Sequence, residues 1–473
     1  MSPSKPYTAP NRQIYAWAIG GMASHLMIGI YGQAMNIFTI GFGLNAVIVG
    51  WAMMFPRVID AILDPILGHW SDDAHTRWGR RKPFIAISSL LGALFIVLLW
   101  WADRSWSEPM QLAYLLVLGT LCYICYGVYT MSWTALGYEL TDDYNERSRV
   151  MAISGLFMTI VLMANGWIYW LALRPIFGGE LYGIRWIAGA AALLVLGTAW
   201  ITLLNCRERF THANQKQHMP IFPALKTTLR NRPFVIFLLY KLFQVFGERV
   251  NTGLLFYLGI YYVCQGDKSL ATGITGIGAT IGTVIGFALV PLMKPISATI
   301  GKKNGLVIAA AVAFVLAVTQ PIILRPDSPY LMLLPTFLLL PLVLIANTLG
   351  GAIVPDICDL DELETGMRRE GLFTAVMGFV AKMEISLTVL IVGYLVSFSG
   401  FDSKLPTQPE PVLHRMLWLA VVPNVIFTLL TLITAARFPL TEATMTDVRR
   451  QLDARHQAHP EESPVGDETG AAA

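Results

Sequence analysis

The chain has 473 residues, of which 55% are hydrophobic and 14% are charged, and its formal net charge is +3. Soluble domains carry about 25% charged residues, so this composition excludes an ordinary soluble protein and favours one with several membrane-spanning helices. The small net charge and the absence of long Lys/Arg runs argue against nucleic acid as a partner.

Apolar segments of roughly 20 residues, the length that spans a bilayer, recur along the chain. They predict transmembrane helices near 14–40, 45–68, 84–102, 111–138, 150–173, 185–205, 233–263, 270–294, 305–323, 330–355, 371–398 and 412–436. We therefore expect an all-α polytopic membrane protein with about twelve spans. The first apolar segment is long and has no small-residue cleavage site, so we expect no removable signal peptide.

The loops between these segments indicate the orientation in the membrane. An even number of spans places both termini on one side. Lys and Arg residues concentrate in the loops assigned to that side, for example at Arg80, Arg147 and Lys302. Because cytoplasmic loops carry the excess of positive charge, we expect cytoplasmic N- and C-termini and a location in the cell (inner) membrane.

The longest polar segment between spans, 206–232, divides the predicted helices into two sets of six. The sequences GRRKP (79–83) and GKKNG (301–305) follow the second helix of each set and indicate an internal repeat. Two pseudo-symmetric six-helix halves joined by a linker form the major facilitator fold. We predict an N-terminal half (1–205), a cytoplasmic linker (206–232), a C-terminal half (233–437) and a disordered cytoplasmic polar tail (438–473).

Several charged residues fall inside predicted spans. Asp60 and Asp64 lie one helical turn apart on a single helix face, in the apolar stretch 51–66. Carboxylates are costly in a bilayer, so this pair indicates a functional site. The cations in spans are Arg57, Lys241, Arg249 and Lys382, and the acids available to them are Asp60, Asp64, Glu248 and Glu384. Structural ion pairs are the alternative interpretation.

Three segments, in chain order, resemble the glycoside-pentoside-hexuronide:cation symporter family. They are RVIDAILDPILGHWSDDAHTRWGRRKPF (57–84), ALGYELTDDYNERSRV (135–150) and PDICDLDELETGMRREGLFTAVMGFVAKME (355–384), and they are similar to the family's helix two, the loop after helix four, and the loop with helix eleven. The resemblance spans nearly the whole chain. It implies a secondary active symporter that couples uptake of a sugar or glycoside to a cation by alternating access. We expect a monomer, although the sequence does not determine the oligomeric state.

The resemblance implies that Asp60 and Asp64 are the cation-site carboxylates and that Lys382 faces them from helix eleven. Two buried carboxylates one turn apart repel, and a nearby ammonium or bound cation restores their charged forms. The family's sodium pattern has an Asn where this chain has Leu63, and a helix-four hydroxyl aligns with Tyr126. Sodium needs several oxygen ligands and a proton needs one carboxylate, so we expect H+ as the co-transported cation, with Na+ as the alternative. We expect no other cofactor and assign no metal site.

The sugar-binding positions of the family are altered in this chain. Its acidic positions on helices one and four align with His25 and Tyr129, whereas the helix-four tryptophan is retained as Trp133. Tyr126, Tyr129 and Trp133 recur at i, i+3 and i+7 and can share a helix face that stacks on a sugar. The candidate substrate-binding residues are His25, Tyr126, Tyr129, Trp133, Lys241 and Gln244. Packing between helices is the alternative for the aromatic residues.

The loop after the second helix approximates the superfamily's helix-two-to-three motif. We expect its arginines to cap helix ends and to pair with acids of neighbouring cytoplasmic loops when the inward side is closed. The candidate gating residues are Asp72, Arg77, Arg80, Arg81, Asp142, Glu146, Asp356 and Asp359, with Asp143 and Glu362 as further acidic candidates.

Other functions are weighed against transport. The sequence has no HExxH or GxSxG motif and no dense His/Cys cluster, so we do not expect an enzyme. We assign the CxxC at Cys122 and Cys125 to helix packing. Transport of a lysolipid or other amphiphile by the same fold, and a non-transporting receptor or scaffold, are the alternatives. The expected partners are a small sugar or glycoside and the lipid bilayer.

Overall fold

The computed structural model describes residues 7, 9–73, 76–141, 143–208, 228–292, 295, 299–367 and 369–458. Some side chains within these ranges, those of Asp64 and Asp72 among them, are not described. The described part of the predicted linker is therefore confined to its two ends. The proposed domain boundaries remain predictions.

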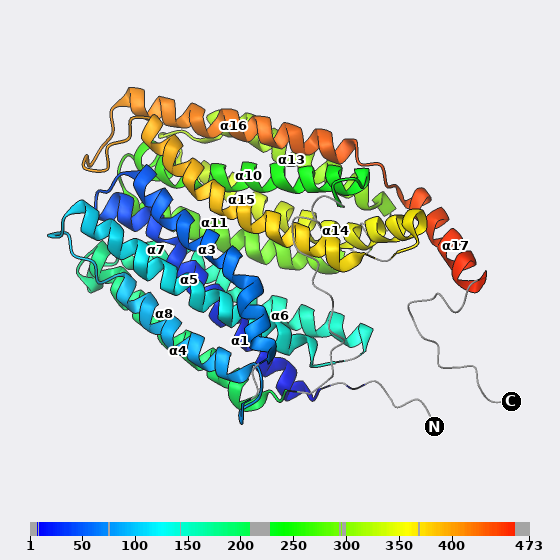
Figure 1. Cartoon of the computed structure of the whole chain (residues 1–473). Helices are drawn as coiled ribbons and strands as arrows, with labels where there is room; N and C mark the ends of the chain where they lie inside the picture. Colours follow the sequence, from blue (N-terminus) through cyan, green and yellow to red (C-terminus); the bar gives the residue numbers. More distant parts are fainter. Residues whose placement is uncertain are drawn as a thin grey trace.

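The described chain is built of helices that run roughly parallel, with both termini at one end (Figure 1). The long helices before the linker are α1 (Asn11–Gly32), α3 (Ala46–Asp73), α4 (Lys82–Leu99), α5 (Glu108–Tyr138), α6 (Tyr144–Asn165) and α8 (Glu180–Asn205). Those after it are α10 (Arg232–Leu258), α11 (Lys268–Leu289), α13 (Lys302–Ile323), α14 (Leu333–Thr365), α15 (Glu370–Phe398) and α16 (Glu410–Ala436).

Shorter elements connect or extend these helices. They are α2 (Ala34–Asn36), α7 (Ile168–Ala172), α17 (Glu442–Ala458), the π-helical turns η1 (Ile37–Gly41) and η3 (Gly259–Val263), and the 3-10 turns η2 (Pro175–Phe177), η4 (Val290–Leu292) and η5 (Pro329–Met332). The two π-helical turns continue α1 and α10 toward the end of the molecule that lies opposite the termini.

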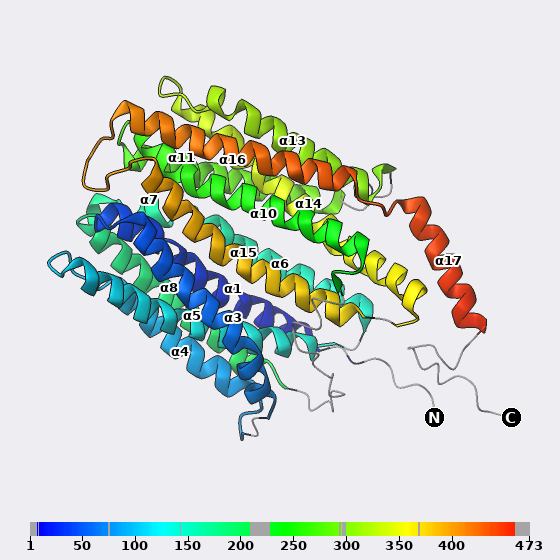
Figure 2. The ribbon, with the colours of Figure 1, turned by 45° about the horizontal axis from the view of Figure 1, so that its top comes forward.

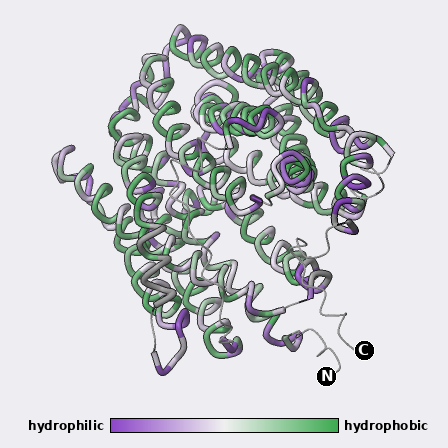
Figure 3. The backbone as a smooth tube through the Cα atoms, turned by 45° about the vertical axis from the view of Figure 1, so that its right-hand side comes forward, coloured by the Kyte–Doolittle hydropathy of each residue, from purple (hydrophilic) through white to green (hydrophobic). Residues whose placement is uncertain are grey.

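Ten of the described helices are long and apolar enough to cross a membrane. The remaining two long helices, α6 and α10, complete the twelve that the sequence predicts. They are more polar because α6 begins with Glu146, Arg147 and Arg149, and α10 contains Lys241 and Glu248. Figure 3 shows hydrophobic residues along most of the helices and hydrophilic residues concentrated in loops and helix ends. The expected all-α polytopic membrane protein is confirmed.

The helices pack as two sets. Within the first, α1 contacts α5, α6 and α8, and α4 contacts α5 and α8. Within the second, α10 contacts α15 and α16, and α14 contacts α11 and α13. The sets meet where α3 packs against α15 and α6 packs against α11, and both views of the ribbon show α3 and α15 side by side (Figure 2).

The expectation of a disordered tail after residue 438 is wrong for residues 442–458, which form α17. Met445, Val448 and Leu452 recur at i, i+3 and i+7 and are all buried. They join a hydrophobic cluster that includes Phe438 and Leu440. The apolar stripe of this otherwise polar helix therefore has a docking surface on the C-terminal half, which composition alone did not reveal.

Candidate functional site

The bond between Asp60 and Lys382 joins the two halves. Lys382 Nζ on α15 donates to Asp60 Oδ2 on α3 at 3.0 Å. The Asp60 side chain is 4% exposed, whereas that of Lys382 is 37% exposed. The structure thus brings together a carboxylate and a cation that the sequence separates by 322 positions.

Glycines allow α3 and α15 to approach closely enough for this contact. A Cβ at Gly393 would lie 2.5 Å from the backbone oxygen of Ala46, and one at Gly50 would lie 3.4 Å from Cα of Leu390. Any larger side chain at residue 393 would therefore force the two helices apart. The ion pair lies further along the same helix–helix contact.

Arg57 brings a second cation to this contact. It precedes Asp60 by three residues on α3, and its side chain is buried. Arg57 Nη1 donates to the backbone oxygen of Ile385 at 2.8 Å, and the guanidinium carbon lies 5.7 Å from the ring centroid of Tyr123 on α5. Two cations and the Asp60 carboxylate therefore meet between α3, α5 and α15.

Asp64 follows Asp60 by one turn within α3, but its side chain lies outside the described residues. A buried cluster with more positive than negative charge is costly unless another anion compensates it. The position of Asp64 on α3 suits that role. Its part in cation coupling remains a prediction.

The predicted aromatic stripe of α5 is divided between two environments. The Trp133 ring stacks on Trp17 of α1 with centroids 4.7 Å apart, and each indole N–H donates to the other residue's backbone oxygen at 2.8 Å. The Tyr129 hydroxyl donates to the backbone oxygen of Gly20 at 2.8 Å. Tyr126 is half-buried and meets Tyr123 edge to face at 5.6 Å. Tyr129 and Trp133 thus join α1 to α5 in this conformation, and their substrate role remains a prediction.

The other candidate substrate residues lie on α1 and α10. The half-buried His25 ring has Nδ1 at 3.2 Å from both the Gly21 backbone oxygen and Ser24 Oγ. Lys241 Nζ donates to Asn347 Oδ1 of α14 at 2.8 Å and to Gln244 Oε1 at 3.4 Å. Gln244 lines a cavity whose walls come from helices of the C-terminal half. The structure therefore does not gather all six candidates in one contact.

The loop between α3 and α4 is held by acids that sequence reasoning missed. Glu139, at the end of α5, accepts from Arg80 Nη2 and Arg81 Nε, each at 3.1 Å. The Glu208 carboxylate accepts from the backbone N–H groups of Arg80, Arg81 and Lys82 at the start of α4, which is the end of a helix that attracts an anion. Arg77 is exposed. Glu139 falls inside the 135–150 segment, and Glu208 lies shortly after α8. A search of the sequence for acidic residues near the ends of the neighbouring helices could have found both.

The equivalent loop of the second half has a similar arrangement. Lys302 Nζ contacts Asp356 Oδ2 of α14 at 2.5 Å, much as Arg80 contacts Glu139. Gly79 and Gly301 both have positive φ, at 112° and 83°. A Cβ on either would lie near a carboxylate that follows the last helix of its half, that of Glu208 or Glu442. The basic match between GRRKP and GKKNG therefore reflects matching roles in the two halves.

Further charges at this end stay within the C-terminal half. Arg449 of α17 contacts Asp356 at 2.9 Å and Asp359 at 3.8 Å. Arg369 donates to both oxygens of Asp361, and these hydrogen bonds raise the pKa of its guanidinium. The sequence did not single out Arg449 because it lies in the segment expected to be disordered.

The predicted gating pairs can be compared with these contacts. Arg80 and Arg81 pair with Glu139 inside the N-terminal half. Asp356 and Asp359 pair with Lys302 and Arg449 inside the C-terminal half. Glu146 pairs with Arg149, one turn along α6. The side chain of Asp72 and the whole of Asp142 lie outside the described residues. The gating role of this set remains a prediction.

The two halves are bonded at the end opposite the termini. Lys268 Nζ of α11 contacts Glu180 Oε2 of α8 at 2.7 Å, and Trp167 Nε1 donates to Thr280 Oγ1 at 2.9 Å. Arg174 also donates to Ser269 Oγ there. These contacts hold the two halves together at the end opposite the termini.

Comparison with known proteins agrees with this architecture. The family model described as MFS/sugar transport protein matches residues 16–442. The glucuronide carrier protein homolog of Escherichia coli is 24% identical, with 94% of this chain and 96% of that protein covered. The isoprimeverose transporter of Lactiplantibacillus pentosus is 25% identical, with 83% and 81% covered.

A solved structure supports the fold alone. The nucleoside transporter NupG superimposes with a TM-score of 0.62 at 14% identity, and 91% of this chain and 98% of that one are covered. At this low identity the superposition supports the fold, and the function is inferred from the family match. This chain is a multi-pass membrane transport protein and belongs to the MFS/sugar transport family, in agreement with the resemblance to glycoside-pentoside-hexuronide:cation symporters.

Proposed function

We propose that the protein is a symporter that couples the uptake of a sugar or glycoside to a proton by alternating access. The observation that carries this proposal is the bond between Asp60 and Lys382, because it joins a buried carboxylate of one half to a cation of the other. The names of the similar glucuronide carrier homolog and isoprimeverose transporter support a sugar-like substrate.

The chemistry of the pair suits exchange of a proton. A proton and the Lys382 ammonium compete for the same Asp60 carboxylate, and protonation removes the negative charge that Lys382 contacts. The lost attraction weakens the contact between α3 and α15 and shifts the balance between arrangements of the halves. Asp64 provides a second carboxylate one turn along α3 for the proton or for Lys382. Leu63 adds no oxygen ligand, which favours a proton over sodium.

The substrate lies between the halves in this proposal. Tyr129 and Trp133 hold α1 against α5. In this proposal His25 on α1 and Tyr126 on α5 contact the substrate. Lys241 and Gln244 contribute from α10. The sugar displaces water and exchanges hydrogen bonds with these side chains.

The orientation follows from the positive loops and the termini. We propose that the protein lies in the inner membrane with both termini in the cytoplasm. We also propose that it is a monomer. The end with Lys268 and Glu180 then faces outward. Arg80, Arg81, Asp356 and Asp359 approach across the inward side when the cycle closes it.

Uptake into proteoliposomes tests the proposal. The purified protein is reconstituted, and uptake of labelled glucuronides and pentosides is measured with an inward proton gradient, with a sodium gradient, and with a protonophore. We expect accumulation with the proton gradient alone and its loss with the protonophore. Accumulation that follows the sodium gradient would contradict proton coupling, and uptake of lysolipid without uptake of any sugar would favour the alternative substrate class.

A further inference from the structure

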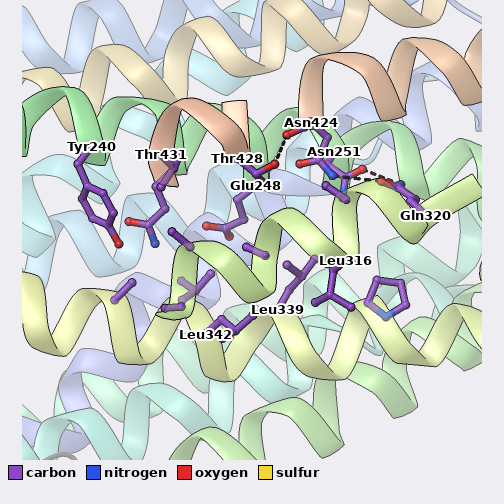
Figure 4. A pocket seen from close by; sticks show the side chains of 18 residues that line it. Tyr240, Glu248, Asn251, Leu316, Gln320, Leu339, Leu342, Asn424, Thr428 and Thr431 are labelled. Atoms are coloured by element: carbon purple, nitrogen blue, oxygen red, sulfur yellow. Dashed lines mark hydrogen bonds between the residues drawn. The ribbon is translucent and has the colours of Figure 1, made fainter. Parts of the chain in front are cut away.

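A cavity lies inside the C-terminal half, between α10, α13, α14 and α16 (Figure 4). Its volume is about 60 Å³. A cavity needs roughly 10–15 Å³ of such space for one water molecule, provided that polar groups line it. The cavity therefore has room for a few waters or a small ion.

Glu248 contributes the acidic side chain of the cavity wall. Figure 4 shows its carboxylate directed into the cavity from α10. Among the described residues, no hydrogen bond and no ion pair within 4 Å reaches this carboxylate. The opposite charges that act on it are Arg249, which is exposed, and Lys241, which instead binds Asn347 and Gln244.

Amide side chains form the polar wall beside Glu248. Gln320 Nε2 donates to Asn251 Oδ1 at 2.8 Å, and Asn424 Nδ2 donates to Gln320 Oε1 at 3.1 Å. These three buried residues connect α10, α13 and α16 in a chain of hydrogen bonds, as Figure 4 shows. Two amide oxygens are thereby occupied by N–H donors, so few oxygens remain to surround a metal cation.

The other ionisable groups near the carboxylate are few. They are Tyr240, Lys241 and Arg249 on α10 itself and Glu384 on the adjacent α15, which is 4% exposed. The described parts of α13, α14 and α16 add amides, hydroxyls and apolar side chains to the wall. The Glu248 side chain is half-buried, and a carboxylate with no ion pair within 4 Å in such a setting is costly as an anion. Protonation removes that cost.

We propose that Glu248 binds a proton in this cavity, forming a proton site inside the C-terminal half that is separate from Asp60 and Lys382. The cavity waters give the proton a route to the carboxylate, and the single carboxylate with its occupied amide neighbours selects a proton over a metal ion. The site needs neither a sugar nor contact between the halves, so it does not rest on the proposed symport.

Infrared spectroscopy of the purified protein tests this site without any transport assay. The carboxylic-acid C=O band is recorded at neutral pH in H2O and in D2O, for the unaltered protein and for Glu248→Gln. We expect an acid band that shifts in D2O and is missing from Glu248→Gln. Its presence unchanged in that variant, or its absence from the unaltered protein, would overturn the proposal.

Two further variants separate this site from the rest of the molecule. Glu248→Asp keeps the acid but shortens it, so the band should shift and remain, which guards against misfolding of the Gln variant. Asp60→Asn should retain the band, even if proton-coupled uptake is never observed. Loss of the band in Asp60→Asn would assign it elsewhere and refute the proposal, as would its replacement by a carboxylate band on addition of Na+.

Discussion

Lys382 on α15 donates a hydrogen bond to Asp60 on α3, across the boundary between the two halves of the bundle. The carboxylate is buried and the ammonium is partly exposed. This asymmetry makes Asp60 the member of the pair that depends on its partner, because the ammonium retains contact with solvent when the bond breaks.

Neutralising Asp60 should uncouple transport. In Asp60→Asn the side chain keeps its size and loses the charge that attracts Lys382 and a proton. We expect the ratio of internal to external sugar to fall to about one, with exchange of sugar across the membrane retained. Uptake and counterflow in proteoliposomes measure both quantities. Asp361→Asn, which removes a buried carboxylate paired with Arg369 within the C-terminal half, is the matched control and should still accumulate sugar.

Removing Lys382 should destabilise the protein through Asp60. Lys382→Met removes the ammonium that donates to the buried Asp60 carboxylate, at a cost of about 1–3 kcal/mol. Thermal unfolding in detergent should therefore begin at a lower temperature. The double variant Asp60→Asn with Lys382→Met should recover most of the loss, since neither charge then remains unpaired. Additive losses in the double variant would show that the pair is not coupled.

Gly79 should resist substitution. Its φ of 112° disfavours any L side chain, and a Cβ would lie 2.6 Å from the Glu208 carboxylate. We expect Gly79→Ala to cost about 1–3 kcal/mol and to detach Glu208 from the start of α4. Gly155→Ala is the control, because a Cβ at that helical position meets no atom within 4 Å. The unfolding temperatures of the two variants check this prediction, and equal values would contradict it.

Variants of Trp17 and Trp133 can distinguish a packing role of Trp133 from a role in substrate binding. Trp17→Phe and Trp133→Phe each remove one indole N–H that donates to the partner's backbone oxygen, and each should cost about 1 kcal/mol of stability. If Trp133 also contacts the sugar, only its variant should raise the KM of uptake beyond the change seen in Trp17→Phe. Equal KM values in the two variants would indicate that Trp133 has a packing role and does not contact the sugar.

Docking of α17 should depend on its apolar stripe. Val448→Asp places a charge in the buried contact with the C-terminal half, whereas Thr446→Asp places the same charge on the exposed side. We expect faster amide hydrogen exchange across 442–458 in the first variant and little change in the second. Equal exchange rates in both would indicate that the buried stripe does not hold the helix.

The long apolar segments were readable from the sequence because bilayer crossing demands length and hydropathy, both of which are local properties. The charged residues of α10 were also visible, but their neighbours were not. Lys241 and Glu248 share a helix face by spacing, yet Lys241 binds Asn347 of α14 and Glu248 faces a cavity. Those outcomes depend on how α13, α14 and α16 pack around α10.

The aromatic residues of α5 show the same limit. Their i, i+3, i+7 spacing predicted one shared face, but residues on one helix face can have different partners. Trp133 meets Trp17 of α1, whereas Tyr126 meets Tyr123. Likewise the stripe of Met445, Val448 and Leu452 was short and surrounded by polar residues, so its burial became evident only with the surface on which it packs.

By itself the sequence determined that this chain crosses a membrane many times, that its halves repeat, and that Asp60 and Lys382 stand in places where charge is costly. Those properties follow from hydropathy, spacing and motif similarity. Only the tertiary structure decided which cation meets which acid, because side chains hundreds of residues apart pair according to helix packing. The same packing placed Glu248 on a cavity and gave the loop after α3 its partners Glu139 and Glu208.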